Sequence, residues 1–155
     1  MKALNLFLLV SVFALFSCQN TPTTEQAEST KTEECTDVKD GMFIHVSKGY
    51  NNPQKVLMAL SLATKMAESK DVALFFDIEG VKLLTKTSED IEMENFLTLH
   101  NAFNELVKMN VLIMACPMCL KKAEIAPEDL REGIIVAEKE KFFDFTKGRI
   151  LSLDY

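Results

Sequence analysis

The chain has 155 residues and a formal net charge of −6 at pH 7. Residues 41–155 carry 14 Lys+Arg and 17 Asp+Glu, so about half of the acidic excess lies before residue 41. The only basic pair in this part is Lys121-Lys122, and such a charge distribution argues against nucleic-acid binding.

The first 18 residues have the features of an export signal. Lys2 precedes the apolar run ALNLFLLVSVFALFS at residues 3–17, and Cys18 follows. This run is shorter than the roughly 20 residues that span a bilayer. A charged start and a short apolar core predict a signal peptide over residues 1–17.

The residues Leu15-Phe16-Ser17-Cys18 resemble a bacterial lipobox, although Phe16 is bulkier than the usual residue. We therefore expect acylation at Cys18 and anchoring in a membrane, for which more than one acyl chain is needed. The expected location is the cell envelope, with the chain exported and facing the periplasm. Ordinary cleavage near Ser17, or an uncleaved anchor, is the alternative.

Residues 18–40 are predicted to be a lipidated cysteine followed by a flexible tether. The stretch QNTPTTEQAESTKTEECTDVKD has only Ala27, Cys35 and Val38 as hydrophobic residues. It cannot bury enough surface to offset the entropy of ordering. Acylation of Cys18 would leave three thiols, an odd number for an exported protein. We expect Cys35 to be unpaired or to bridge two chains.

Residues 41–155 alternate between strand and helix patterns along the chain. The strand-like runs are MFIHV at 42–46, DVALFF at 71–76, VLIMA at 111–115, IIV at 134–136 and a last one at 149–154. Helical spacing fits 53–69 with Asn52 as cap, a short piece at 81–84, then 94–109, 116–122 and 138–145. The alternation predicts an open α/β domain of five mainly parallel strands with helices on both faces, a three-layer α/β/α fold.

Three predicted loops meet at the carboxyl edge of this sheet, where such folds bind ligands. They are residues 47–52, 77–80 and 116–119, and the third contains Cys116 and Cys119. Cys116 also precedes a helix, whose free N–H groups and dipole favour a thiolate.

Charged residues of the other two loops are candidates for substrate binding. Lys48, Asp77 and Glu79 are predicted to face the cysteine loop. Each of them is otherwise a solvated loop charge.

Three segments resemble the DsrE/DsrF-like family of sulfur-handling proteins. They are FIHVSKGYNNPQKVLMALSLATKMAES, DVALFFDIEGVKLL and NVLIMACPMCLKKAEI. In many members the cysteine loop is A-C-G-T-C-L-K-A-R-G. Here Pro117-Met118 replaces the small pair, and Glu124 stands where glycine is common.

The resemblance implies that Cys116 is the sulfur-accepting cysteine and Cys119 a second cysteine present in some members. It also implies a partner that is a sulfur donor or acceptor protein, or a small thiol. Known members act in cytoplasmic sulfur relay, whereas this chain is predicted to be exported. The resemblance thus favours thiol chemistry over any particular pathway.

Two classes of function remain open. In the first, Cys116 carries sulfane sulfur as a persulfide or exchanges disulfides with Cys119, as a sulfurtransferase or thiol–disulfide exchange protein. In the second, the chain binds a soft metal such as Cu(I) through Met114, Met118 and the two thiolates, or binds a partner without catalysis. Inert buried thiols are a third interpretation.

No cofactor and no resident metal are expected, because neither histidine has metal-ligand spacing to the cysteines. His45 alternates with Phe43 along its strand and is interpreted as a core histidine. His100 lies beside Phe96 and Phe103 and is interpreted as a boundary residue of its helix. An open sheet with exposed edges also permits a homo-oligomer.

Overall fold

The computed structural model describes residues 38–155. The predicted signal peptide, the lipidation site at Cys18 and the tether with Cys35 lie outside the described residues. Within the described range, no helix combines the length and the apolar character needed to cross a membrane.

The predicted five-stranded sheet is confirmed, and every strand pair in it is parallel. The strands follow the order β4-β3-β2-β1-β5 across the sheet. The strands and main helices are β1 (Gly41–Val46), α1 (Pro53–Ala67), β2 (Asp71–Phe76), α2 (Leu99–Lys108), β3 (Leu112–Ala115), α3 (Pro117–Lys122), β4 (Ile134–Val136), α4 (Lys141–Asp144) and β5 (Ile150–Asp154). Two 3₁₀ helices, η1 (Gly80–Leu84) and η2 (Pro127–Asp129), lie in the connections.

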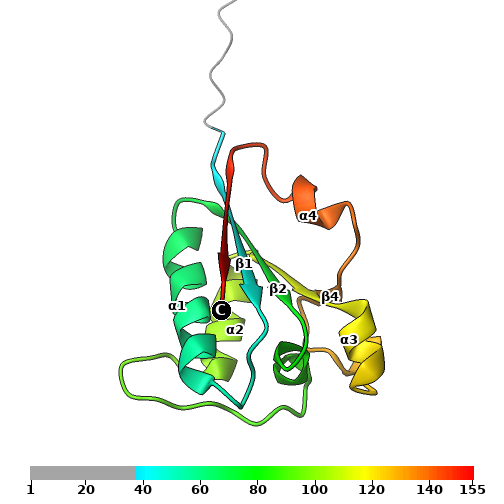
Figure 1. Ribbon diagram of the computed structural model, residues 1–155. Helices are drawn as coiled ribbons and strands as arrows, with labels where there is room; N and C mark the ends of the chain where they lie inside the picture. Colours follow the sequence, from blue (N-terminus) through cyan, green and yellow to red (C-terminus); the bar gives the residue numbers. More distant parts are fainter. Residues whose placement is uncertain (1–37) are drawn as a thin grey trace, which may run out of the picture. The chain divides into compact units, whose positions relative to one another are not determined.

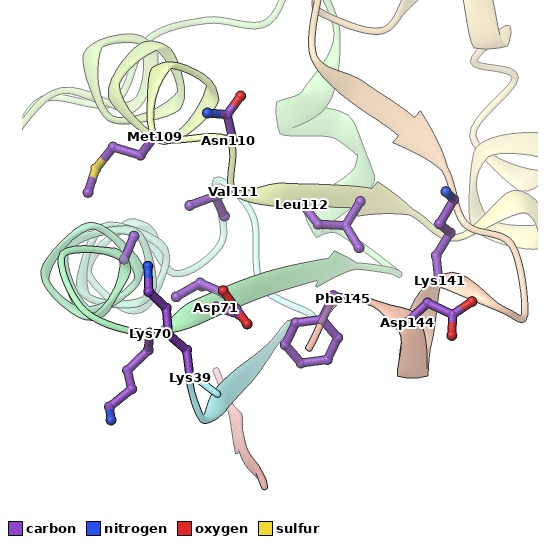
Figure 2. A pocket seen from close by; sticks show the side chains of 12 residues that line it. Lys39, Lys70, Asp71, Met109, Asn110, Val111, Leu112, Lys141, Asp144 and Phe145 are labelled. Atoms are coloured by element: carbon purple, nitrogen blue, oxygen red, sulfur yellow. The ribbon is translucent and has the colours of Figure 1, made fainter. Parts of the chain in front are cut away.

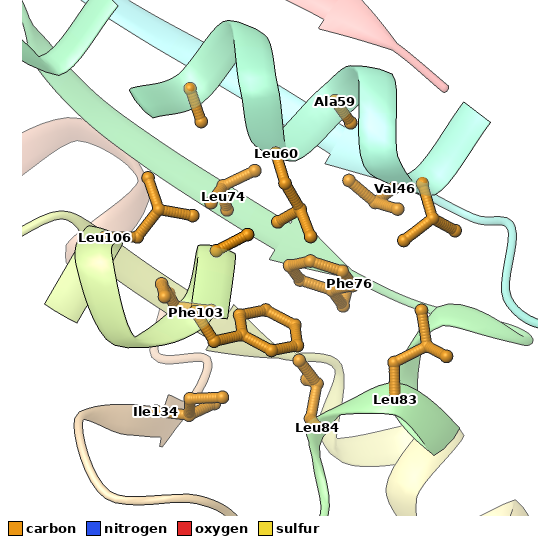
Figure 3. Packing of buried hydrophobic residues seen from close by; sticks show 14 of the residues in the cluster. Val46, Ala59, Leu60, Leu74, Phe76, Leu83, Leu84, Phe103, Leu106 and Ile134 are labelled. Atoms are coloured by element: carbon orange, nitrogen blue, oxygen red, sulfur yellow. The ribbon is translucent and has the colours of Figure 1, made fainter. Parts of the chain in front are cut away.

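One face of the sheet packs against α1 and α2, which lie together on that side (Figure 1). Alternate residues of the central strands point into this layer, and Ile44, Leu74 and Phe76 are completely buried there. Leu60 of α1 and Phe103 of α2 meet them from the helix side (Figure 3). Burial of each such large side chain contributes roughly 1.5–3 kcal/mol before entropy is counted.

The opposite face is covered by the short helix α4, which lies on the other side of the sheet in Figure 1. Phe142 packs against Phe75 with ring centroids 5.1 Å apart and against Phe43 at 5.7 Å. Phe43 and Phe75 are only partly buried, so this layer is thinner than the first.

Two predicted helices are shorter than the sequence pattern indicated. The helix expected over 94–109 begins at Leu99, because Thr98 caps it by accepting from the Asn101 N–H at 3.4 Å. Asn95 has φ of +68°, which no helix can accommodate. The helix expected over 138–145 forms only over Lys141–Asp144. The helical spacing of apolar residues in the sequence therefore covered more residues than the helix itself.

Helices α2 and α3 end in the same hydrogen-bonded turn, the Schellman motif. After α3, the N–H of Ile125 donates to the Leu120 carbonyl at 3.0 Å, and Glu124 has φ of +57°. After α2, Asn110 takes the equivalent place with the same φ. Asparagine tolerates the left-handed region, whereas glutamate at that φ is strained. The resemblance places a common glycine at the position of Glu124.

We predict that Glu124→Gly stabilises the fold by about 1 kcal/mol, because glycine adopts this backbone conformation without a Cβ clash. Urea unfolding followed by circular dichroism measures the change. Asn110→Gly is the matched control and should give a smaller gain. A loss of stability in Glu124→Gly would show that the glutamate side chain contributes more than its backbone strain costs.

Candidate functional site

Cys116 lies where β3 ends and α3 begins. Its N–H donates to the Phe76 carbonyl of β2 at 2.9 Å, so the cysteine extends the sheet ladder by one residue. Its own carbonyl accepts the first helical hydrogen bond, from Leu120 at 2.9 Å. Pro117 fits the first helical position because it has no N–H to satisfy.

Cys119 lies one turn further along α3, and both cysteines are free thiols with partly buried side chains. The Ile78 N–H donates to Cys119 Sγ at 3.2 Å. Cys116 is close enough to Cys119 to affect its pKa. The turn after β2 is therefore in direct contact with the cysteine loop, as the loop positions predicted.

The pKa of Cys119 is raised above its ordinary value. Burial is the main cause, and the neighbouring Cys116 and the negative charge of Asp77 add to it. The Ile78 N–H acts in the opposite direction, because it stabilises the thiolate. Cys119 thus keeps its proton at neutral pH.

A hollow of about 180 Å³ opens beside Cys119. It has room for a few water molecules or a small anion, since a water occupies about 30 Å³ of liquid. Its lining is Ile78, Glu79, Lys82, Cys119, Lys122 and Ala123. Glu79 therefore borders the thiol, and its carboxylate pairs with Lys82 at 2.7 Å.

Two glycines allow the first two loops to pack backbone against backbone. A Cβ on Gly80 would meet the Val46 carbonyl at 2.5 Å, and one on Gly49 would meet the Glu79 carbonyl at 2.6 Å. This packing brings the main chain of Lys48 to the turn, with its carbonyl 3.3 Å from that Gly80 position. Among residues 38–155, no hydrogen bond or ion pair involves the Lys48 side chain.

Asp77 binds His45, a residue that sequence reasoning interpreted as a core histidine. His45 Nε2 lies 3.0 Å from Asp77 Oδ1, and His45 Nδ1 lies 2.7 Å from Asp154 Oδ1. The imidazole is thus between two carboxylates at the carboxyl edge of the sheet. The position of His45 near the end of β1 was the signal available in the sequence, whereas Asp154 required knowledge of which strand pairs with β1.

The two contacts of His45 differ in quality. The contact with Asp154 is a well-formed hydrogen bond. Nε2 and Asp77 Oδ1 are both buried and are close, but they are not aligned as a good hydrogen bond. Burial lowers the pKa of His45, but the two carboxylates outweigh it and the net pKa is raised above 6.5.

A larger hollow, of about 390 Å³, lies at the opposite edge of the sheet, near the starts of β2 and β3 (Figure 2). Lys39 and Lys70 lie on one side of it, and Lys141 and Asp144 on the other. It contains no thiol. We therefore place the candidate site at the cysteine edge, where the two free thiols are.

Metal binding has less support than thiol chemistry at this edge. Within residues 38–155, no group of three His, Cys, Asp or Glu side chains is arranged so that it could hold a metal ion. Met114 is fully buried in β3 and Met118 is 80% exposed on α3, so the two thioethers lie in opposite environments.

The raised pKa of His45 predicts a specific pH dependence of stability. Its ion pairs stabilise the fold fully below about pH 6.5, and this contribution is lost as the pH rises through the folded pKa. The expected loss is a few tenths of a kcal/mol, about the value of a screened pair, because the side chains of His45 and Asp154 are 29% and 80% exposed. Urea unfolding from about pH 6 to about pH 9 should show a decline that is absent in His45→Gln. His100→Gln, at a histidine elsewhere in the chain, should retain the decline, and a decline unchanged in His45→Gln would contradict the assignment.

Comparison with known proteins supports the fold and the family. Two of the solved structures that are similar to this chain each have 18% identity and are each matched over 74% of this chain and 99% of their own. They are the ychN protein from E. coli, with a TM-score of 0.59, and MTH1491 from Methanobacterium thermoautotrophicum, a protein described as of unknown function, with a TM-score of 0.53. No curated protein matches the chain. The model of the DsrE/DsrF-like family matches residues 40–147, and the chain belongs to that family.

Proposed function

We propose that this protein handles sulfur through its thiol pair, with Cys116 carrying sulfane sulfur as a persulfide and Cys119 resolving it. The observation that carries the proposal is the placement of both thiols at the carboxyl edge of a parallel sheet, where Cys119 Sγ accepts a hydrogen bond from a main-chain N–H of the neighbouring loop. Membership of the DsrE/DsrF-like family supports a sulfur-relay type of role.

The first step is a sulfur transfer without net oxidation. The Cys116 thiolate attacks the outer sulfur of a donor persulfide, R–S–SH. The new S–S bond forms on Cys116, the donor S–S bond breaks, and R–S⁻ leaves and takes a proton from solvent. The donor is either a protein or a small thiol.

Two routes then release the sulfur. In one, an acceptor thiolate attacks the outer sulfur and restores the Cys116 thiolate. In the other, the Cys119 thiolate attacks Cys116 Sγ, which forms the Cys116–Cys119 disulfide and expels HS⁻. The second route oxidises the two cysteines and reduces the sulfur, so a dithiol must then reduce the disulfide.

The roles of the two cysteines follow from their surroundings. Cys119 holds its proton because of burial and its negative neighbours, which suits a resolving thiol that acts second. Cys116 lies at the junction of strand and helix, where the nucleophile is expected. Glu79, Lys82 and Lys122 are the charged residues that border the hollow, where an incoming donor would enter.

We also propose that the sulfur chemistry takes place in the cell envelope, with the protein anchored through acylated Cys18. The support is the apolar run over residues 3–17 followed by Ser17-Cys18. The polar composition of residues 19–40 suits a spacer between the anchor and the α/β domain.

We predict that the full chain, exposed to inorganic polysulfide, gains one or more sulfur atoms on the peptide containing residues 109–121. Cys116→Ser should reduce this gain by at least about tenfold, because it removes the nucleophile. Cys119→Ser should retain the gain and lose it more slowly, because the resolving thiol is absent. Mass spectrometry of the intact chain and of this peptide measures both effects.

Variants that each replace one of the two cysteines are needed for that measurement, because a single tryptic peptide contains both thiols. Cys35→Ser is the matched control and should behave as the unchanged chain does. Equal sulfur loading in Cys116→Ser would reverse the assigned roles. Copper that copurifies with the chain and is lost with both thiols would favour the metal-binding alternative.

For the anchor, we predict that Cys18→Ala abolishes labelling with a fatty-acid probe and moves the chain from the membrane to the soluble fraction. Two or more acyl chains are required for stable anchoring, so loss of the single acceptor should remove it. Cys35→Ala should still be labelled. Labelling that persists in Cys18→Ala would contradict the lipoprotein assignment.

A further inference from the structure

The turn that contacts Cys119 is held in a strained conformation. Ile78 has φ of +44°, in the left-handed region that β-branched residues avoid. Its side chain is 61% exposed, so burial of that side chain does not explain the strain. The conformation directs the Ile78 N–H at the Cys119 sulfur. Strain of this kind persists only where neighbouring contacts hold it.

The residue before Ile78 supplies such a contact. Asp77 follows β2 directly, its N–H donates to the Val46 carbonyl at 3.2 Å, and its carbonyl accepts from the Gly80 N–H at 2.7 Å. Its carboxylate is only 20% exposed and lies against His45 Nε2. The backbone and the side chain of Asp77 are therefore both fixed, and the side chain is fixed by the imidazole.

The charged groups that face His45 come from two elements. The turn after β2 supplies Asp77, and β5 supplies Asp154. The remaining neighbour on β2 is the uncharged ring of Phe75, with centroids 5.7 Å apart. On this face α4 presents Phe142, which packs on Phe43 and Phe75.

We propose that His45 is a positioning residue for the thiol pair: by binding the Asp77 carboxylate it holds the strained turn in which the Ile78 N–H faces Cys119. This inference rests on the proposed use of Cys116 and Cys119 in thiol chemistry. It adds to that proposal a residue that touches neither thiol.

The protonation state of the His45 imidazole determines whether it can bind the Asp77 carboxylate. Imidazolium carries a proton on each ring nitrogen and a positive charge, so it donates to Asp154 and attracts the Asp77 carboxylate at 3.0 Å. Neutral imidazole has one N–H, and the well-formed bond from Nδ1 to Asp154 uses it. Nε2 then presents a lone pair to Asp77 Oδ1, so the carboxylate is repelled.

A released Asp77 carboxylate would act against a thiolate at Cys119. Aspartate side chains accept hydrogen bonds from N–H groups one or two residues further along the chain, so Asp77 would compete with the sulfur for the N–H groups of its own turn. Its negative charge already raises the pKa of Cys119. Deprotonation of His45 should therefore make Cys119 less reactive than an isolated thiol would be at the same pH.

The test is the rate of iodoacetamide alkylation at Cys119 as a function of pH, in the full chain carrying Cys116→Ser. For an isolated thiol well below its pKa, the rate rises about tenfold per pH unit. In this chain the rise should flatten where His45 titrates. His45→Leu should remove the flattening and lower the rate near pH 6 by about two- to tenfold, the effect of losing one ordinary hydrogen bond. An unchanged profile in His45→Leu overturns the proposal.

Two further variants separate positioning from a general structural role. His45→Gln keeps a donor for Asp77 without a titratable group, so it should restore part of the rate without the flattening. Asp154→Asn loosens β5 but leaves His45 beside Asp77, so it should keep the rate near pH 6. A loss in Asp154→Asn equal to that in His45→Leu would assign the effect to β5 and overturn the proposal.

Asp77→Asn tests the same link from the other side, and it serves if His45→Leu fails to fold. Asp77→Asn should increase the rate of Cys119 alkylation and remove the flattening. Adding His45→Leu to Asp77→Asn should change the rate by less than about twofold, because both residues are proposed to act on Cys119 through the same contact. A profile like that of the unchanged chain would overturn the proposal. Alkylation measures Cys119 directly, so a failure of persulfide formation on Cys116 would leave this result interpretable by itself.

Discussion

The hydrogen-bonded ladder between β2 and β3 is the constraint on which the site depends. It continues one residue past the sheet, through the bond from the Cys116 N–H to the Phe76 carbonyl. Phe76 and Ala115 are fully buried, so this end of the ladder cannot shift without opening the core. The ladder therefore fixes the start of α3 against the turn after β2. The contacts of the thiols, including the hydrogen bond from the Ile78 N–H to Cys119 Sγ, depend on this register between β2 and β3.

The central strands and the cysteine edge could be predicted from the sequence because their signals are local. Apolar runs locate β2 and β3, and in a parallel sheet the loops after them must meet at one edge. The contact between His45 and Asp154 has no local signal, since it joins residues 109 positions apart through the pairing of β1 with β5. The first residues of the helix expected at 94–109 are not helical, for a different reason. The Thr98 cap and the left-handed backbone of Asn95 outweigh the apolar spacing.

Backbone strain is concentrated around the cysteine loop. Ile78 lies in the turn that contacts this loop, and Glu124 follows α3. Both residues have a positive φ although neither is glycine. The two cases differ in their physical consequences. The strain at Glu124 ends a helix and is relieved by a residue without a Cβ. At Ile78 the same backbone angle directs an N–H at a sulfur atom, so the strain there belongs to the contact with Cys119.

The edge strand β5 links the thiol site to the least buried part of the sheet. Four of its five residues are exposed, so burial contributes little to holding it. Polar contacts hold both ends instead: Arg149 donates to the Asp40 carboxylate at 2.7 Å near its start, and Asp154 accepts from His45 at its end. Elements with few buried contacts open at low free energy. Cys119 is therefore anchored beside the buried centre of the sheet, while Asp77 is linked through His45 to an edge strand with few buried residues.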